Sequence, residues 1–327
     1  MPRLTLLSLA FALLLAIPGE SPHRSASRSF VPGRNGIWIG HQWYTGRNVQ
    51  TGAPVSAAER RELIQRLRAH HILYVYLHVG PLLPDGSIRD QAGPELQALL
   101  QEAPDLVVFA WLGGGAYRLN LRDSGLRLAI VGTVDRLRHE GFQGVHLDIE
   151  PIRDWHSGYL ALLRDLRHSF GREFLLSHAT RRAGPFGFSR GPLRSWFWSE
   201  KFYREAMALT DQTVLMAYDT TLDSQALYTR FVQHETGLMM DWGCQVPGHE
   251  VLIGIPAFED SPVSNPQVEN IPNAVRGVWA ALARSSSPPS CFAGVALYAE
   301  WVTSPAEWRQ FEQARKNCHA FGPSCTQ

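Results

Sequence analysis

Short apolar stretches with strand character alternate with helical stretches along most of this chain, and this alternation restricts the possible folds. Strands are expected at residues 36–40, 72–79, 106–112, 144–150, 174–179, 213–219, 251–256 and 294–298. Helices are expected at residues 56–70, 94–102, 126–139, 158–170, in a segment that ends at 208, and at 225–238, 268–283 and 305–316. Eight strands that alternate with helices are typical of a barrel. The sequence therefore predicts an α/β fold, a single-domain (β/α)8 TIM barrel over residues 36–317.

A doubly wound open sheet is the alternative interpretation of the same alternation. That fold binds dinucleotides through a glycine-rich turn with a fixed glycine spacing. The run Gly113-Gly114-Gly115 follows the third predicted strand and lacks that spacing. We therefore favour the barrel and expect the three glycines to form a flexible turn.

The N-terminal segment has the pattern of an export signal. Residues 1–3 include an arginine, residues 4–17 are mostly apolar, and residues 18–21 are small or polar. The apolar run is shorter than the roughly 20 residues that a spanning helix needs, so cleavage is favoured over a membrane anchor. We predict a signal peptide at 1–21, a polar linker at 22–35 and a secreted or periplasmic protein. We expect no later segment to span a membrane.

The four cysteines fit an exported chain, because disulfide bonds persist outside the cytosol. We expect Cys244 to pair with Cys291 and Cys318 with Cys325, the second pair closing a C-terminal tail at 318–327, although four cysteines allow three connectivities. Neither the cysteines nor the 13 histidines show metal-ligand spacing. We predict no metal site and no cofactor.

The charge balance argues against a nucleic-acid partner. The chain has 31 Lys and Arg residues against 30 Asp and Glu residues, and its formal net charge is +1. Nucleic-acid binding normally requires a basic patch, often with interleaved aromatic residues. We expect a monomer that binds no nucleic acid.

The predicted strand at 144–150 carries two carboxylates to its own C-terminal end. Because successive side chains in a strand face opposite sides, His146, Asp148 and Glu150 share one face. Burial and repulsion between neighbouring acids raise a carboxyl pKa, which allows general acid catalysis near neutral pH. In a barrel, the C-terminal strand ends line the active site. The alternative is a solvated acid pair, or one bridged to arginines.

Five segments at predicted strand ends resemble motifs of glycoside hydrolase family 18, the chitinases and their relatives. In chain order they are Trp111-Leu112-Gly113-Gly114, Gly144-Val145-His146-Leu147-Asp148-Ile149-Glu150, Met216-Ala217-Tyr218-Asp219, Ile253-Gly254-Ile255-Pro256 and Gly294-Val295-Ala296-Leu297-Tyr298. They are similar to the family's Ser-x-Gly-Gly, Asp-x-Asp-x-Glu, Met-x-Tyr-Asp, Gly-x-Pro and eighth-strand motifs. Trp111 replaces the family's Ser, and Tyr298 replaces its usual Trp. The resemblance covers residues 36–316.

The resemblance implies substrate-assisted, retaining hydrolysis of a carbohydrate that contains N-acetylglucosamine. Glu150 would protonate the glycosidic oxygen and later act as the base for water. Asp148 would orient the substrate's acetamido group, which attacks the anomeric carbon, and Tyr218 would hydrogen-bond the same group.

Further substrate-binding candidates come from the same strand ends. Asp219 is a candidate for the floor of the site or for a sugar hydroxyl, with an ordinary strand-end carboxylate as the alternative. Trp111 and Tyr298 are candidate sugar platforms, since flat rings match pyranose faces, but they would also suit barrel packing. Met216 is a weaker candidate, for which we favour packing.

Two residues keep other functions open. His146 stands where the family has an Asp, and we expect it to donate an N–H to Asp148 and to alter the pH dependence. This departure also allows a carbohydrate-binding protein without turnover. Glu300 is predicted to face the same way as Tyr298, so it is a candidate partner of Glu150 in a two-carboxylate glycosidase of other specificity. The alternative for Glu300 is a loop salt bridge.

Overall fold

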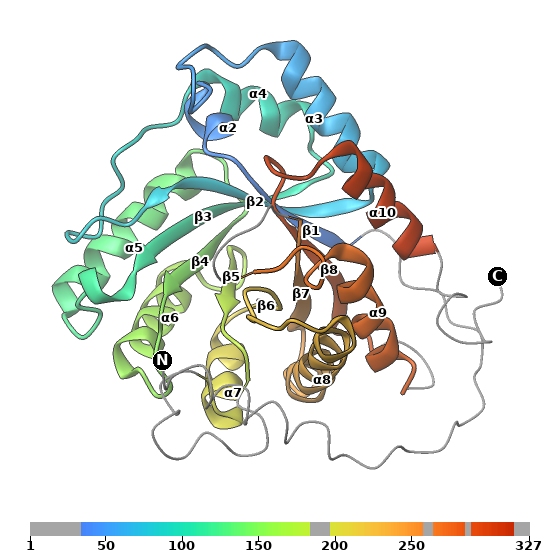
Figure 1. The fold of residues 1–327 in the computed structure, drawn as a ribbon. Helices are drawn as coiled ribbons and strands as arrows, with labels where there is room; N and C mark the ends of the chain where they lie inside the picture. Colours follow the sequence, from blue (N-terminus) through green and yellow to red (C-terminus); the bar gives the residue numbers. More distant parts are fainter. Residues whose placement is uncertain (1–33, 184–196, 258–263, 285–288, 317–327) are drawn as a thin grey trace, which may run out of the picture.

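The computed structural model of the chain describes residues 34–183, 197–257, 264–284 and 289–316. Its strands are all parallel and close into one barrel in the order β1-β2-β3-β4-β5-β6-β7-β8. Helices surround the barrel on the outside (Figure 1). The prediction of a single-domain (β/α)8 barrel is confirmed.

The strands keep the order that the sequence predicted. Their bounds are β1 Asn35–Ile39, β2 Ile72–Pro81, β3 Val107–Gly115, β4 Gly144–Glu150, β5 Leu175–Thr180, β6 Gln212–Met216, β7 Glu250–Pro256 and β8 Phe292–Tyr298.

Each of the first seven strands is followed by at least one helix before the next strand, and within the described residues one helix follows β8. These are α2 Gln42–Thr45, α3 Ala57–Ala69, α4 Pro94–Glu102, α5 Ser124–His139, α6 Ser157–Phe170, α7 Glu200–Leu209, α8 Gln225–Gly243, α9 Ile271–Leu282 and α10 Pro305–Lys316, with a 3-10 turn η2 at Ala116–Arg118.

Side-chain caps fix where several helices begin. Ser56 accepts a hydrogen bond from the Glu59 N–H, and the Glu59 carboxylate accepts one from the Ser56 N–H, so α3 begins with a capping box. Four other helices have a simpler cap, in which one side-chain oxygen accepts a hydrogen bond from a backbone N–H of the first turn. The capping residues are Asp123 for α5, Ser199 for α7, Ser224 for α8 and Asn270 for α9. These contacts satisfy backbone N–H groups that a helix leaves unpaired in its first turn.

Strand alternation divides the buried apolar residues into two sets. The set inside the barrel includes Trp38, Tyr76, Phe109, Val214, Leu252 and Ala296. The set between strands and helices includes Val145, Leu147 and Ile149, which are the outward-facing residues of β4. The intervening residues of β4, His146, Asp148 and Glu150, therefore face the interior and the mouth.

The glycines after residue 112 do not form the flexible turn that the sequence suggested. Gly113, Gly114 and Gly115 are the last residues of β3 and pair with Asp148, Ile149 and Glu150 of β4. β3 therefore continues as far as β4 offers hydrogen-bonding partners. The backbone of these glycines, which carries no side chains, lies directly beside Asp148 and Glu150.

The sixth strand is shorter than predicted. β6 ends at Met216, and the backbone of Asp219 and Thr221 enters the left-handed region with φ of 54° and 60°. A strand cannot continue through that conformation. Tyr218 and Asp219 thus lie on the β6–α8 loop rather than in the strand.

One of the two expected disulfide bonds falls within the described residues. Cys244, at the end of α8, is bonded to Cys291, immediately before β8, as predicted. The predicted signal peptide, residues 22–33 of the linker and the Cys318–Cys325 tail lie outside the described residues. None of the described helices is both long and apolar enough to cross a membrane.

Candidate active site

Asp148 and Glu150 lie at the C-terminal end of β4, where the barrel opens. The Trp111 indole N–H donates to Asp148 Oδ2 at 3.0 Å. Asp148 Oδ1 is buried and has no hydrogen-bond partner among the described residues. Glu150, the next residue on the same face, is exposed at the mouth. Asp148 is therefore fixed by one oxygen and keeps the other oxygen as an available acceptor, whereas Glu150 is accessible to solvent.

The surroundings of both acids favour their protonated forms. Burial raises the pKa of Asp148, and the Trp111 hydrogen bond opposes this rise. Partial desolvation at the mouth raises the pKa of Glu150, and the charges of Asp148 and Asp219 add to the effect. Glu150 is open to solvent on one side, which screens these charges. A protonated carboxyl near neutral pH is what a general acid requires.

The β6–α8 loop brings Tyr218 against the acids. Tyr218 is buried and its ring stacks on that of Tyr298, with centroids 5.1 Å apart. Burial raises the pKa of Tyr218, with further contributions from Tyr298, Asp148 and Glu150, so the phenol stays protonated. Asp219 is exposed beside it, and partial burial raises its pKa. Tyr218 is therefore a hydroxyl close to the carboxyl pair.

His146 does not contact Asp148 in the way that we expected. Its Nδ1 lies 2.8 Å from Ser177 Oγ, and Gln212 Oε1 accepts hydrogen bonds from both Ser177 and Tyr76. Because the Ser177 hydroxyl donates its proton to Gln212, its oxygen accepts a hydrogen bond from His146 Nδ1. The imidazole proton is therefore on Nδ1. Nε2 is buried without a hydrogen-bond partner among the described residues, and it carries a lone pair rather than a proton.

His146 also has no surface with which to touch a substrate. Its exposed fraction is 0%, and burial and the neighbouring His178 hold its pKa well below the usual range. It is therefore a neutral side chain beneath the mouth. This placement does not support the prediction that His146 binds substrate directly.

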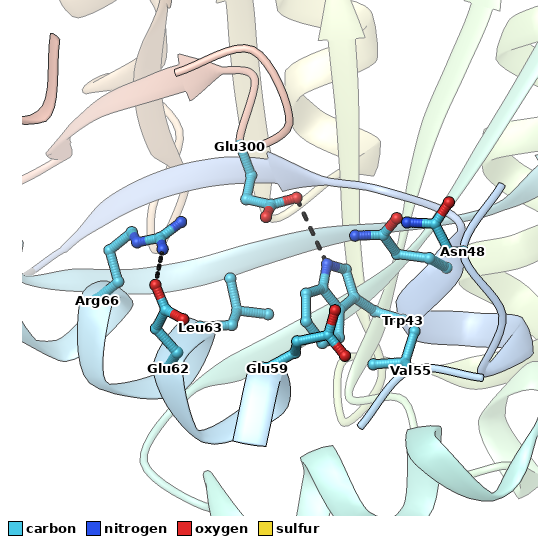
Figure 2. A pocket seen from close by; sticks show the side chains of 9 residues that line it. Trp43, Asn48, Val55, Glu59, Glu62, Leu63, Arg66 and Glu300 are labelled. Atoms are coloured by element: carbon cyan, nitrogen blue, oxygen red, sulfur yellow. Dashed lines mark hydrogen bonds and ion pairs between the residues drawn. The ribbon is translucent and has the colours of Figure 1, made fainter. Parts of the chain in front are cut away.

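Glu300 is engaged on another side of the barrel rim. It is only 9% exposed, and its Oε2 accepts a hydrogen bond of 3.4 Å from the Trp43 indole. Figure 2 shows Glu300 turned toward Trp43. Both residues line a cavity of about 140 Å³ between α2, α3 and the segment after β8. The structure thus does not bring Glu300 together with Glu150. Among the described residues Glu300 makes no salt bridge, and Arg66, which lines the same cavity, pairs with Glu62.

Aromatic rings form one wall of the mouth. Trp111 is 7% exposed and stacks on Trp301, with centroids 6.3 Å apart and planes 10° from parallel. Trp301 is 48% exposed, and its ring also meets the edge of Tyr298. Trp111 therefore serves mainly to hold Asp148, whereas Trp301 presents a surface that a sugar ring can cover. Met216, the last residue of β6, is half-buried.

Sequence reasoning missed Trp301 and Arg182. Trp301 follows β8 by three residues, and a tryptophan close to a predicted C-terminal strand end was the available signal. Arg182 follows β5 by two residues and donates to the Asp219 carbonyl at 2.7 Å. No local pattern marks this arginine, since its partner is 37 residues away. Within the described residues, no three His, Cys, Asp or Glu side chains are grouped as a metal site.

No family model matches the sequence of this chain, and no curated protein matches it. Solved structures are similar at the level of the fold. The spore cortex-lytic enzyme SleL of Bacillus megaterium superposes with a TM-score of 0.60 at 12% identity, over 94% of this chain and 81% of that enzyme.

Two further similar structures carry the family 18 designation. The chitinase ChiB of Flavobacterium johnsoniae gives a TM-score of 0.56 at 13% identity, over 90% of this chain and 94% of its own. A fungal endo-β-N-acetylglucosaminidase gives a TM-score of 0.56 at 14% identity, over 88% and 98%. The structure therefore confirms the resemblance as one of fold.

Proposed function

We propose that this protein is an exported glycoside hydrolase that cleaves an N-acetylglucosamine-containing polysaccharide or glycan by substrate-assisted, retaining hydrolysis. One observation carries the proposal. Asp148, with one oxygen fixed by Trp111 and the other without a partner among the described residues, lies beside the exposed Glu150 at the mouth of the barrel. The similar structures support it, because they include chitinases and an endo-β-N-acetylglucosaminidase.

Each residue has a role that its surroundings suit. Glu150 is accessible and tends to keep its proton, so it protonates the leaving oxygen and then takes a proton from water. The free Asp148 Oδ1 accepts the N–H of the substrate's acetamido group and stabilises the positive charge that develops on it. The Tyr218 hydroxyl donates to the acetamido oxygen as this oxygen attacks the anomeric carbon. The substrate itself supplies the nucleophile.

Export is part of the proposal. The predicted signal peptide supports export, and so does the Cys244–Cys291 disulfide, because disulfide bonds persist in oxidising compartments and are rare in the cytosol. We propose a secreted or periplasmic monomer whose partner is the carbohydrate substrate.

The test is hydrolysis of a fluorogenic N-acetylglucosamine oligomer by wild-type protein and by Glu150→Gln, over a wide pH range. We expect turnover by the wild type and its loss in the variant. A second substrate series without the acetamido group tests the mechanism, because substrate assistance predicts no cleavage of these compounds. Equal cleavage of both series would instead support a two-carboxylate mechanism, for which Glu300 is poorly placed.

A carbohydrate-binding protein without turnover is the second candidate. The burial of His146 favours it, since Nε2 carries no proton and cannot donate to Asp148. Among the described residues, Asp148 would then have only the Trp111 hydrogen bond to keep it oriented between steps. Binding of N-acetylglucosamine oligomers by the wild type, measured by calorimetry, without hydrolysis at any pH would establish this function.

A further inference from the structure

Arg182 connects two loops at the mouth of the barrel. It follows β5, and its Nη2 donates to the backbone carbonyl of Asp219 on the β6–α8 loop at 2.7 Å. Its own carbonyl accepts a hydrogen bond from the Trp198 N–H at 3.2 Å. The arginine is thus fixed at both its backbone and its guanidinium, and it holds the loop that carries Tyr218.

The β6–α8 loop adopts a conformation that requires such contacts. Asp219 and Thr221 have φ of 54° and 60°, which costs energy for residues other than glycine. The loop is held from three further sides. The Tyr228 hydroxyl donates to Ala217 O at 2.8 Å, the Ala217 N–H donates to Gly254 O at 3.0 Å, and the Glu269 carboxylate accepts from the Thr220 N–H at 2.8 Å. Only the Arg182 contact is made to Asp219 itself among these four.

Arg182 is also the cation that several acids share. Its positive charge lowers the pKa of Glu150, Asp219, Glu235 and Glu269. Glu235 is 2% exposed and accepts from the Ala183 N–H at 2.8 Å, and burial raises its pKa to about 8. Arg182 is half-buried, and the charges of Glu235, Glu269 and Asp219 offset part of the desolvation that lowers its pKa. Arg182 therefore interacts electrostatically both with Glu150 and with these three acids.

The groups that act on Glu150 come from three neighbouring elements. They are Asp148 on β4, Arg181 and Arg182 after β5, and Asp219 after β6. Two are acids, which favour the protonated carboxyl, and two are arginines, which favour the carboxylate. Arg182 also donates to the Asp219 carbonyl.

We propose that Arg182 is a positioning residue of the site, an inference that rests on the proposed hydrolysis: its guanidinium fixes the Asp219 carbonyl, which keeps Tyr218 beside the acids. The positive charge of Arg182 also favours the carboxylate form of Glu150. The two effects are separable. A lysine keeps the positive charge but not the planar guanidinium that reaches the carbonyl. A methionine keeps much of the length and loses the charge.

The test is the pH profile of kcat/KM on the fluorogenic oligomer. Arg182→Met removes a charge that lowers the pKa of Glu150, so Glu150 stays protonated to higher pH and the alkaline limb moves to higher pH. We expect kcat to fall by about tenfold to a hundredfold as well, because Tyr218 is less well placed. Arg182→Lys should show the lower kcat with the alkaline limb in its wild-type position.

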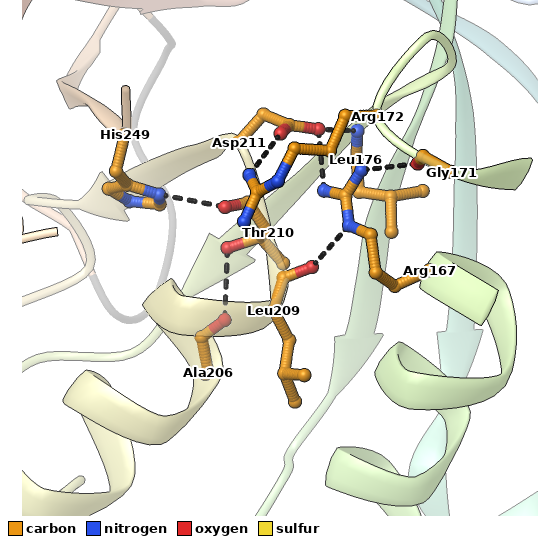
Figure 3. Close-up of polar contacts among 9 residues, drawn as sticks. All are labelled: Arg167, Gly171, Arg172, Leu176, Ala206, Leu209, Thr210, Asp211 and His249. Atoms are coloured by element: carbon orange, nitrogen blue, oxygen red, sulfur yellow. Dashed lines mark hydrogen bonds and ion pairs between the residues drawn. The ribbon is translucent and has the colours of Figure 1, made fainter. Parts of the chain in front are cut away.

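The matched control removes an arginine at the opposite end of the barrel. Arg172 is 64% exposed and its Nη1 lies 3.3 Å from Asp211 Oδ1 (Figure 3). Arg172→Met should leave kcat and both limbs unchanged. An alkaline limb that stays in place in Arg182→Met, or that moves equally in Arg172→Met, would overturn the proposal.

A second measurement separates this inference from the proposed function. Carboxyl carbon NMR of glutamate-labelled protein, with the Glu150 signal assigned from Glu150→Gln, follows the titration of Glu150 without any substrate. A Glu150 pKa that rises in Arg182→Met supports the inference even if the wild type hydrolyses nothing. An unchanged Glu150 titration overturns it even if the protein is an active glycosidase.

Discussion

Acidic side chains have different surroundings at the two ends of the barrel. At the N-terminal end, Asp211 precedes β6 and each of its oxygens has partners. Oδ2 accepts from Arg167 at 2.6 Å and from the Leu176 N–H at 2.8 Å, and Oδ1 accepts from Arg172 at 3.3 Å (Figure 3). Glu250 at the start of β7 is similarly held by Arg34 and Tyr74.

At the C-terminal end, the acids are left incompletely paired. Asp148 accepts one hydrogen bond and its Oδ1 has none among the described residues, while Glu150 is exposed, and the charges of Asp148 and Asp219 act on it. Paired acids contribute to stability, whereas acids that are hard to ionise are available for proton transfer. Under the proposed function, the comparison teaches that acids at the N-terminal end of the barrel stabilise the fold, whereas acids at the C-terminal end are available for the reaction.

The largest difference between the two ends should come from Glu150→Gln. We expect hydrolysis to fall by about 10²-fold to 10⁴-fold, because a general acid is removed. The free energy of unfolding should hold or rise, since repulsion with Asp148 is relieved. Kinetics and urea unfolding check both parts. Glu200→Gln, which changes an exposed acid paired with Arg204, is the control and should alter neither.

The converse substitution is Asp211→Ala. It leaves the Leu176 N–H and the mostly buried Arg167 without their acceptor, so we expect the free energy of unfolding to fall by about 2–4 kcal/mol. Turnover by the folded molecules should not change. Asp135→Ala breaks the exposed pair with Arg138 and should cost less than about 1 kcal/mol. Loss of turnover without loss of stability in Asp211→Ala would contradict the comparison.

The pH dependence of stability offers a finer test. The folded protein raises the pKa of Asp148 and Glu150 above their unfolded values near 4, so it binds more protons than the unfolded chain in the interval between the two values. The stability of the wild type should therefore fall as pH rises through that interval. The free energy of unfolding of the double variant Asp148→Asn/Glu150→Gln should fall less over the same pH range. We expect the difference between variant and wild type to be smaller than the effect of Asp211→Ala. Parallel pH curves from urea unfolding would show that the acids carry no such cost.

The smallest expected effect concerns substrate affinity. Trp301→Ala removes an exposed ring at the mouth, and we expect KM for the oligomer to rise about tenfold with little change in kcat. Leu128→Ala removes a 71% exposed apolar side chain on α5, away from the mouth, and should change neither constant. A fall in kcat alone for Trp301→Ala would mean that the ring acts on the acids rather than on the sugar.

Much of the fold could be predicted, because each strand and helix has its own periodicity. The helix at Pro94–Glu102 was predicted with the observed bounds, since a proline at its start pre-sets the backbone. The end of β3 was not, because Gly113–Gly115 remain in the strand through pairing with β4, 35 residues along the chain, and Gly113 also pairs with Pro81 of β2. Pairing between distant segments is not visible in a local pattern.

The candidate site divides in the same way. The shared face of Asp148 and Glu150 follows from strand alternation, and the structure places both residues at the mouth. The positions of Glu300, Trp301 and Arg182 depend on how loops pack after the strands end. The shift of the His146 proton to Nδ1 depends on Ser177 and Gln212, which lie on other strands. Such contacts exist only once the barrel has closed.

The bare backbone of β3 beside the acids also determines how this site can diverge. A methyl group added at Gly113 would meet only the Asp148 carbonyl oxygen, at 4.0 Å, whereas one at Gly115 would approach the Tyr117 ring to 2.7 Å. Small side chains at position 113 are therefore compatible with the barrel, and they would reduce the width of the space next to Asp148. We therefore expect single substitutions at this position to narrow the substrate range while the barrel stays folded, in evolution as well as in protein engineering.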